Sequence, residues 1–133
     1  MKTILPIILT IALLLCVSTV GHGDDDSKKK RCKEHPMLSG PCFKVKGKMF
    51  LSNGTPSVRI WPVGTKRILG ISEGRFHLDD YGNVPDDLVQ QLNWKTVMYA
   101  DFTVCPFTSD KPGVMRLVCV ESAENISIRV RQQ

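Results

Sequence analysis

The sequence predicts an all-β fold, a small antiparallel sandwich or barrel of six to seven strands with one short helix and two disulfides. Three observations support this prediction. Apolar and polar residues alternate with a period of two in several short runs, which is the pattern of half-buried strands. Turn residues (Gly, Asn and Pro) separate those runs. The chain has 133 residues, enough for one such domain, and an α+β fold is the second choice.

The N-terminal residues 1–23 have the layout of a secretory signal peptide. A basic start precedes an almost wholly apolar run over residues 4–20, and the small residues Gly21 and Gly23 precede an acidic run. We therefore expect this segment to be removed, which leaves no membrane span. The protein is then secreted or periplasmic.

Two alternatives keep the chain at a membrane. The apolar run is near the shortest length that spans a bilayer, so an uncleaved N-terminal segment would act as an anchor. Lipid attachment at Cys16 would have the same effect. Against it, the large Leu15 stands where a lipoprotein signal normally has a small residue.

Residues 24–41 are predicted to be a flexible basic arm, and residues 42–133 a single β-domain. The chain has a net charge of +5, and five positive charges lie between Lys28 and Lys33. Such an arm attracts anionic lipid, polysaccharide or nucleic acid. The acidic residues 24–26 partly cancel its field, so a solvated leader is the simpler interpretation.

Four cysteines follow the leader: Cys32, Cys42, Cys105 and Cys119. An even number in a small exported domain predicts two disulfides. We favour the local pairing, in which Cys105 and Cys119 face each other across two strands that flank a turn. Cys32 and Cys42 would then close a short loop, and each bridge would contribute ~2–4 kcal/mol. A zinc site is not indicated, because the sequence has neither a C-x-x-C pair nor histidines at ligand spacing.

The first half of the β-domain has the clearest strand pattern. Residues 43–51 alternate between an apolar face and a face that carries lysines. The turn sequence Asn53-Gly54 leads to a second strand over residues 57–63, and a third strand covers residues 67–71. Because Pro62 lacks a backbone donor, the second strand lies at an edge or ends there. The simplest arrangement is an antiparallel meander.

The second half is predicted to contain a helix and further strands. Residues 84–92 begin like a helix, with a proline in the first turn and acidic residues after it. A short strand is possible over residues 75–78, and longer β runs cover residues 95–107 and 114–120. The last strand covers residues 125–130, with its apolar residues facing inward: Ile126, Ile128 and Val130.

The candidate binding residues are Arg59 and Trp61, which face outward on the second strand, and the nearby Lys66 and Arg67. A tryptophan beside basic groups stacks on a base or a sugar, or anchors a protein partner. For an exported protein we expect an envelope protein or a polysaccharide, and not nucleic acid. The simpler alternative places Trp61 in the core with Arg59 at its rim.

The sequence has no recognised catalytic, phosphate-binding or dinucleotide-binding motif. We therefore predict a binding or structural module with no cofactor and no metal, and not an enzyme. The alternative is a small secreted hydrolase or metal-binding protein that uses His77 with nearby acids. Such a protein would need a concave pocket in which His77 meets Asp79, Asp80 or Asp101.

Three segments carry a resemblance to a known group. They read G-K-M-F-L-S-N-G-T-P-S-V-R-I-W-P-V-G-T-K-R-I-L-G over residues 47–70, D-F-T-V-C-P-F over residues 101–107 and V-C-V-E-S-A over residues 118–123. This pattern resembles a group of small exported bacterial proteins without an assigned activity, which implies a secreted or periplasmic setting and no mechanism. The hairpin around Asn53 is also similar, at the level of fold, to prealbumin-like sandwich modules. Asn53 and Asn125 begin glycosylation sequons, which are used only in a eukaryotic secretory pathway.

Overall fold

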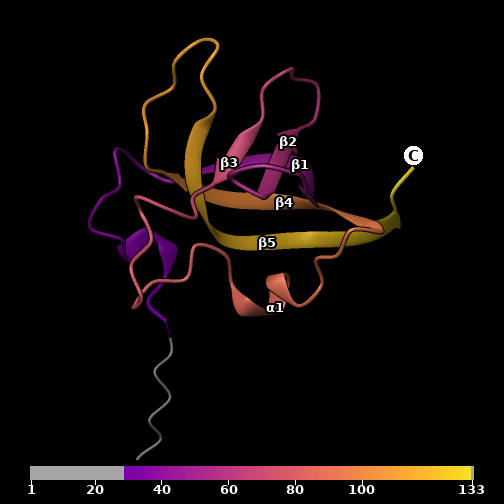
Figure 1. The fold of residues 1–133 in the computed structure, drawn as a ribbon, viewed down its shortest axis with the longest axis horizontal. Coiled ribbons are helices and arrows are strands. Elements are labelled where there is room, and N and C mark those ends of the chain that lie inside the picture. Colours follow the sequence, from indigo (N-terminus) through magenta and orange to yellow (C-terminus); the bar gives the residue numbers. More distant parts are fainter. Residues whose placement is uncertain (1–28, 133) are drawn as a thin grey trace, which may run out of the picture.

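The computed structural model describes residues 29–132. The predicted signal peptide and the first residues of the predicted arm lie outside the described residues. Figure 1 shows the fold, whose elements are η1 (Cys32–Glu34), β1 (Phe43–Leu51), β2 (Val58–Pro62), β3 (Leu69–Ile71), α1 (Asp86–Val89), β4 (Thr96–Pro106) and β5 (Arg116–Val130). None of the helices within residues 29–132 has the length and apolar character needed to cross a membrane.

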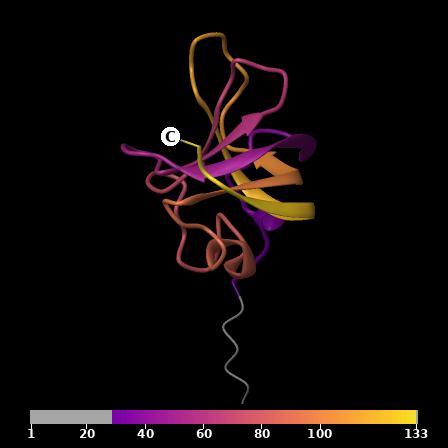
Figure 2. The same ribbon diagram turned by 90° about the vertical axis from the view of Figure 1, so that its right-hand side faces the viewer.

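The five strands close into a barrel in the order β1-β2-β3-β5-β4, and β4 pairs with β1 to complete the ring (Figure 2). All pairs are antiparallel except β3 with β5. The chain passes from β3 through α1 to β4, so β5 returns beside β3 in the same direction. The predicted β-rich fold with a barrel, one short helix and two disulfides is confirmed, but a wholly antiparallel arrangement is wrong.

The prediction of six to seven strands is also wrong, because two predicted strands are one. β5 runs through 15 residues without a break. Asn125 has a positive φ of 54°, and the pairing with β4 shifts by one residue at this point, so the chain forms a bulge and not a turn. Residues 75–78 form no strand.

The barrel is filled by the inward residues of every strand, as the alternation predicts for β1, β2 and β4. On β4 the inward buried residues are Met98, Ala100, Phe102 and Val104, and the residues between them are only partly buried. Leu88 of α1 packs against the same cluster and helps to close one end of the barrel. Each fully buried large side chain contributes about 1.5–3 kcal/mol, so this cluster is the main source of stability.

Two glycines permit close approaches in the barrel wall. A Cβ atom on Gly47 of β1 would lie 2.7 Å from the backbone oxygen of Trp61, so β1 and β2 can pack this closely only with glycine there. A Cβ atom on Gly70 of β3 would lie 2.6 Å from Pro56 and 2.7 Å from Met115. The loops that carry Pro56 and Met115 therefore cover the outer side of β3.

The C-terminal half of β5 extends past the ring. β3 pairs only with its first residues, Arg116 to Val118. Ile126, Ile128 and Val130 face inward as the alternation predicts, but they are not buried: these residues are 39%, 43% and 79% exposed. They lie on the same side of the sheet as Met98, but no described strand continues the barrel around them.

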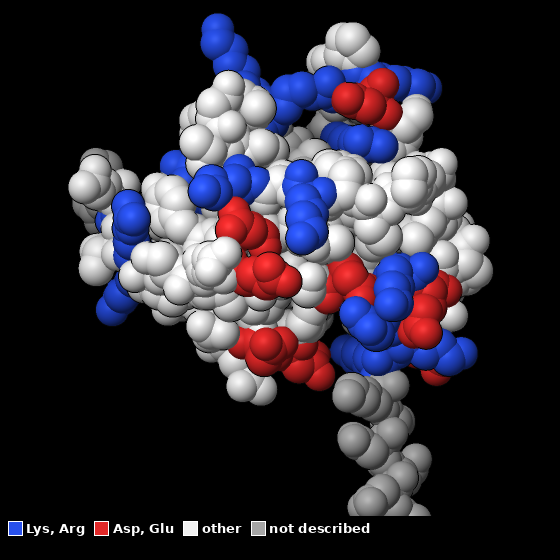
Figure 3. Space-filling model, turned by 180° about the vertical axis from the view of Figure 1, so that it is seen from behind, with Lys and Arg blue, Asp and Glu red and all other residues white. Residues whose placement is uncertain are grey.

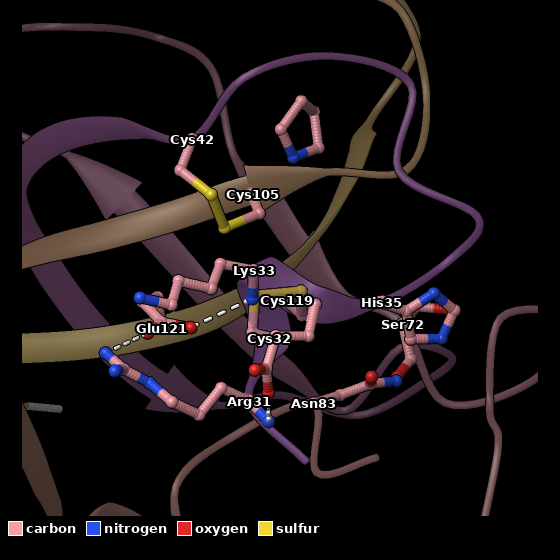
Figure 4. Close-up of a disulfide and its surroundings, with 12 residues drawn as sticks. Arg31, Cys32, Lys33, His35, Cys42, Ser72, Asn83, Cys105, Cys119 and Glu121 are labelled. Atoms are coloured by element: carbon pink, nitrogen blue, oxygen red, sulfur yellow. Dashed lines mark hydrogen bonds and ion pairs between the residues drawn. A yellow bond between two sulfur atoms is a disulfide. The ribbon is translucent and has the colours of Figure 1, made fainter. Parts of the chain in front are cut away.

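The two disulfides join Cys32 to Cys119 and Cys42 to Cys105 (Figure 4). The predicted local pairing is therefore wrong, although Cys105 does lie directly opposite Cys119 in the pairing of β4 with β5. Opposed residues of a pair present their side chains on one face, and the N-terminal segment crosses that face. Each of its cysteines bonds to one member of the opposed pair.

The described part of the predicted arm packs against the barrel. Lys30 forms a β-bridge with Tyr81, and His35 is only 4% exposed. The Nδ1 atom of His35 accepts the N–H of Met37 at 3.1 Å, so the ring proton is on Nε2, which donates to the Phe76 carbonyl at 3.1 Å. The ring also contacts Phe107 edge-on with a centroid distance of 4.7 Å.

A buried acid completes the docking of this segment. Glu121 of β5 has a side chain only 6% exposed, and it forms an ion pair with Arg31. It also accepts the backbone N–H of Lys33 at 2.9 Å (Figure 4). The N-terminal segment is thus held by disulfides, a buried histidine and a buried carboxylate.

Candidate ligand-binding face

Arg59 and Trp61 both lie on the outer surface of β2, as predicted. Trp61 is 40% exposed, and its Nε1 atom donates to the Thr65 carbonyl at 2.7 Å. This hydrogen bond fixes the indole across the end of β2. Arg59 is half-buried, and its Nε atom donates to the Pro56 carbonyl at 3.0 Å. The indole therefore lies on the surface of the barrel and not in its core.

Lys66 and Arg67 lie elsewhere, in the loop between β2 and β3. Arg67 forms an ion pair with Asp110 at 2.6 Å and donates to the Lys111 carbonyl at 2.8 Å. Figures 1 and 2 both show this loop beside the β4–β5 loop, at the same end of the barrel. The guanidinium of Arg67 thus ties two loops together. Lys66 and Arg67 line a hollow between these loops, separate from the one that Trp61 lines.

The groove beside Trp61 has a volume of about 530 Å³. Direct pairing aligns Trp61 of β2 with Lys48 of β1 and Tyr99 of β4, so these three side chains form one row across three strands. Phe50, Arg129 and Arg131 line the same groove from β1 and the C-terminal end of the chain. We call these six residues the aromatic–cation face: Lys48, Phe50, Trp61, Tyr99, Arg129 and Arg131.

Each aromatic ring in this face has its own cation. The Lys48 ammonium lies 4.8 Å from the centroid of the Trp61 ring. The Arg129 guanidinium lies 4.7 Å from the Tyr99 ring. Such exposed contacts contribute only about 0.5–1 kcal/mol each, but they hold the cations over the rings.

The third pair is Arg131 with Phe50. The Arg131 guanidinium lies 5.7 Å from the Phe50 ring, and its Nη1 atom donates to the Leu51 carbonyl at 2.9 Å. Because Arg131 is partly buried, water competes less for this hydrogen bond, and the bond fixes the position of the guanidinium. The face therefore presents ordered positive groups above a floor of rings.

Acidic groups bound this face on one side. Asp101 of β4 lies opposite Lys46 of β1 and opposite Glu124 of β5. The Oδ2 atom of Asp101 accepts the Asn125 side-chain amide at 2.8 Å. Figure 3 likewise shows positive and negative side chains interspersed on the side seen from behind, and no continuous basic surface. Asp101 and Glu124 thus limit the positive charge of the groove on this side.

The carboxylate of Glu73 organises the β1–β2 loop. It accepts the backbone N–H of Ser57 at 2.8 Å and that of Val58 at 3.4 Å, and also the Ser57 hydroxyl. Burial alone raises the pKa of Glu73, but these hydrogen bonds outweigh it and lower the pKa below its ordinary value. The loop that carries Pro56 is therefore held best when Glu73 is ionised.

His77 lies on the surface of the molecule beside Asp79. Its Nε2 atom lies 3.5 Å from Asp79, and both side chains are exposed. Within residues 29–132, the cysteines Cys32, Cys105 and Cys119 alone form a group with metal-ligand proximity, and their sulfurs are in disulfides. Asp101 belongs to the border of the aromatic–cation face.

Of this face, the sequence pattern singled out Trp61 alone and not the other five residues: Lys48, Phe50, Tyr99, Arg129 and Arg131. A signal for them existed, because the alternation of β1, β4 and the last strand places these side chains outward. The missing information was the register, which sets Lys48 between Trp61 and Tyr99. Comparison with family models, with curated proteins and with solved structures finds no match for this chain.

Proposed function

We propose that this protein is an exported binding module that holds an acidic polysaccharide of the cell envelope on its aromatic–cation face. One observation supports this most directly. Three aromatic rings, Phe50, Trp61 and Tyr99, line one groove of about 530 Å³, and each has a cation within 4.7–5.7 Å. The two disulfides fit an oxidising compartment outside the cytoplasm.

The chemistry of an acidic sugar matches both parts of the groove. The apolar face of a sugar ring stacks on an aromatic side chain, while an arginine guanidinium binds a carboxylate or sulfate through paired hydrogen bonds. Trp61 and Tyr99 are two strands apart, which corresponds to roughly 10 Å. This distance leaves room for more than one sugar ring, so we favour an extended chain over a monosaccharide.

The barrel topology supports a binding role by analogy. A five-stranded barrel in this order, with a helix between β3 and β4, is the arrangement of OB folds, which bind oligosaccharides and oligonucleotides. Those proteins commonly bind on the outer surface of strands 2 and 3. Here Pro56 and Met115 pack over Gly70 of β3, so the aromatic–cation face is the more open surface.

The test is a fluorescence titration of a Trp94→Phe protein, in which Trp61 is the remaining tryptophan, with a uronic-acid oligosaccharide. A neutral oligosaccharide of equal length is the matched ligand control. We expect the acidic ligand to change the Trp61 emission and to bind more weakly as salt is added. Arg129→Gln should weaken binding about tenfold, since a charge-assisted hydrogen bond contributes about 1.5 kcal/mol.

Arg75→Gln is the matched protein control. Arg75 is also exposed and also stacks on an aromatic ring, that of Phe76, but it lies outside the groove. It should leave the affinity unchanged. Equal binding of the neutral and acidic ligands, or equal loss in both arginine variants, would refute the assignment. Tighter binding of single-stranded DNA than of the acidic glycan would make a nucleic acid the ligand instead.

A further inference from the structure

The C-terminal half of β5 has an open backbone edge. On the side of β5 away from β4, β3 pairs only with the start of the strand. The Asn83 carbonyl accepts a hydrogen bond from the N–H of Val120 at 2.8 Å. From residue 121 to residue 130, β4 is the only described strand that pairs with β5. Figure 1 shows this half of β5 running beside β4 and past β2 and β3.

The pairing with β4 determines which backbone groups face the open edge. Arg131 donates its N–H to the Lys95 carbonyl at 2.8 Å, so Arg131 belongs to a hydrogen-bonded pair with β4. Hydrogen-bonded and non-bonded pairs alternate along an antiparallel ladder. The N–H and C=O groups of Ile126, Ile128 and Val130 therefore point away from β4, toward the open edge.

Between the bulge at Asn125 and the end of β5, this edge has neither a lysine nor a proline. Natural proteins protect open edges with lysine, proline or very short strands. The open part of β1 follows this rule, since its exposed residues include Lys44 and Lys46. On β5 the edge instead carries Ile126, Ile128 and Val130, whose side chains are 39%, 43% and 79% exposed.

We propose that a second copy of this chain pairs with the edge, so that the two β5 strands run antiparallel across a two-fold axis. A register centred on Ser127 places Ile126 opposite Ile128 of the second copy, with their free N–H and C=O groups facing each other. The same register places Arg129 beside Glu124 of the second copy. The segment is thus complementary to itself in backbone, apolar surface and charge, and the axis forms each contact twice.

The occupant follows from that self-complementarity. An unrelated peptide would need to supply both an acid and a base in matching positions, whereas a second β5 has them already. The bulge at Asn125 ends the free segment on one side, which limits the possible registers.

The test measures the mass of the disulfide-bonded protein by sedimentation velocity over a wide range of concentration. We expect the mass of two chains at high concentration. Ile128→Pro removes the outward N–H and keeps the β4–β5 hydrogen bonds, because that N–H does not bond to β4. Two symmetry-related hydrogen bonds are lost, so the dissociation constant of the dimer should rise about 30-fold, equivalent to about 2 kcal/mol.

Ile128→Thr is the matched control, since it keeps both the N–H and the β-branched shape and should weaken pairing less. Glu124→Arg should weaken pairing, and adding Arg129→Glu should restore it, which tests the register even where the proline variant does not fold. Circular dichroism establishes that each variant is folded. A single-chain mass at every concentration would overturn the proposal. So would a dimer that neither Ile128→Pro nor Glu124→Arg weakens.

Discussion

The pairing of the cysteines makes a quantitative prediction about stability. The Cys42–Cys105 bond joins residues 63 positions apart, and the Cys32–Cys119 bond joins residues 87 positions apart. In the chain-entropy model, closing a loop lowers the entropy of the unfolded chain. Taken one at a time, loops of these lengths stabilise the folded state by about 4.3 and 4.6 kcal/mol. The local pairing would close much shorter loops, worth about 3 kcal/mol each.

The perturbation is the double variant Cys42→Ala/Cys105→Ala, which leaves the other bond intact. We expect its free energy of unfolding, measured by urea denaturation at an unchanged pH and temperature, to fall by about 3 kcal/mol, because the remaining Cys32–Cys119 bond shortens the loop that Cys42–Cys105 closes. The assay is read together with peptide mapping under non-reducing conditions. A Cys105–Cys119 cross-linked peptide in the native protein, or a loss below about 2 kcal/mol, would refute the reasoning.

Three further predictions concern single side chains. His35→Ala should lower the free energy of unfolding by about 3 kcal/mol, because the buried Phe76 carbonyl and Met37 N–H lose their partner. Urea titration measures this loss, and a loss under about 1 kcal/mol contradicts the prediction. The pKa of Glu73 is lowered in the folded state. Its contribution to the free energy of unfolding is therefore fully present above the ordinary pKa of about 4.5, and it is lost as the pH falls through the folded-state pKa. Glu73→Gln should therefore reduce stability at neutral pH and converge with the natural protein under acid, and parallel stability–pH curves would speak against it. Gly47→Val should leave little folded protein by circular dichroism, because its side chain meets the Trp61 carbonyl, whereas Gly74→Val meets nothing within 4 Å and serves as the control.

Local properties of the chain were readable from the sequence. The period-two alternation placed the inward residues of β1, β2 and β4 correctly, because each strand has one buried and one outer face. It did not predict the exposure of Ile126 and Ile128, where the same apolar pattern continues after the barrel has ended. Alternation reports which residues share a face, but whether another strand covers that face depends on distant parts of the chain.

Pairing between distant residues was not readable. Cys105 and Cys119 are opposed as predicted. No local sequence pattern indicates that the N-terminal segment crosses that face and that its two cysteines bond to Cys105 and Cys119. The binding face shows the same limit. Arg59 and Trp61 are outward on β2, but the cations of the groove come from β1 and the C-terminal end of the chain, which only the register brings beside them.

Both disulfides attach the beginning of the chain to strands that the ribosome makes last. Cys32 emerges 87 residues before Cys119, and its neighbour Cys42 is available long before either native partner. A bond between Cys32 and Cys42 can thus form first, and it must be broken for the native pairs to form. In the folded protein the sulfurs of Cys32, Cys105 and Cys119 lie within 4.8 Å of one another, so a chain that reaches this arrangement with one of them still a thiolate brings it beside the other sulfurs, where exchange can occur. Wherever the Cys32–Cys42 bond forms first, the native pairs are reached by rearrangement of disulfides and not by oxidation alone.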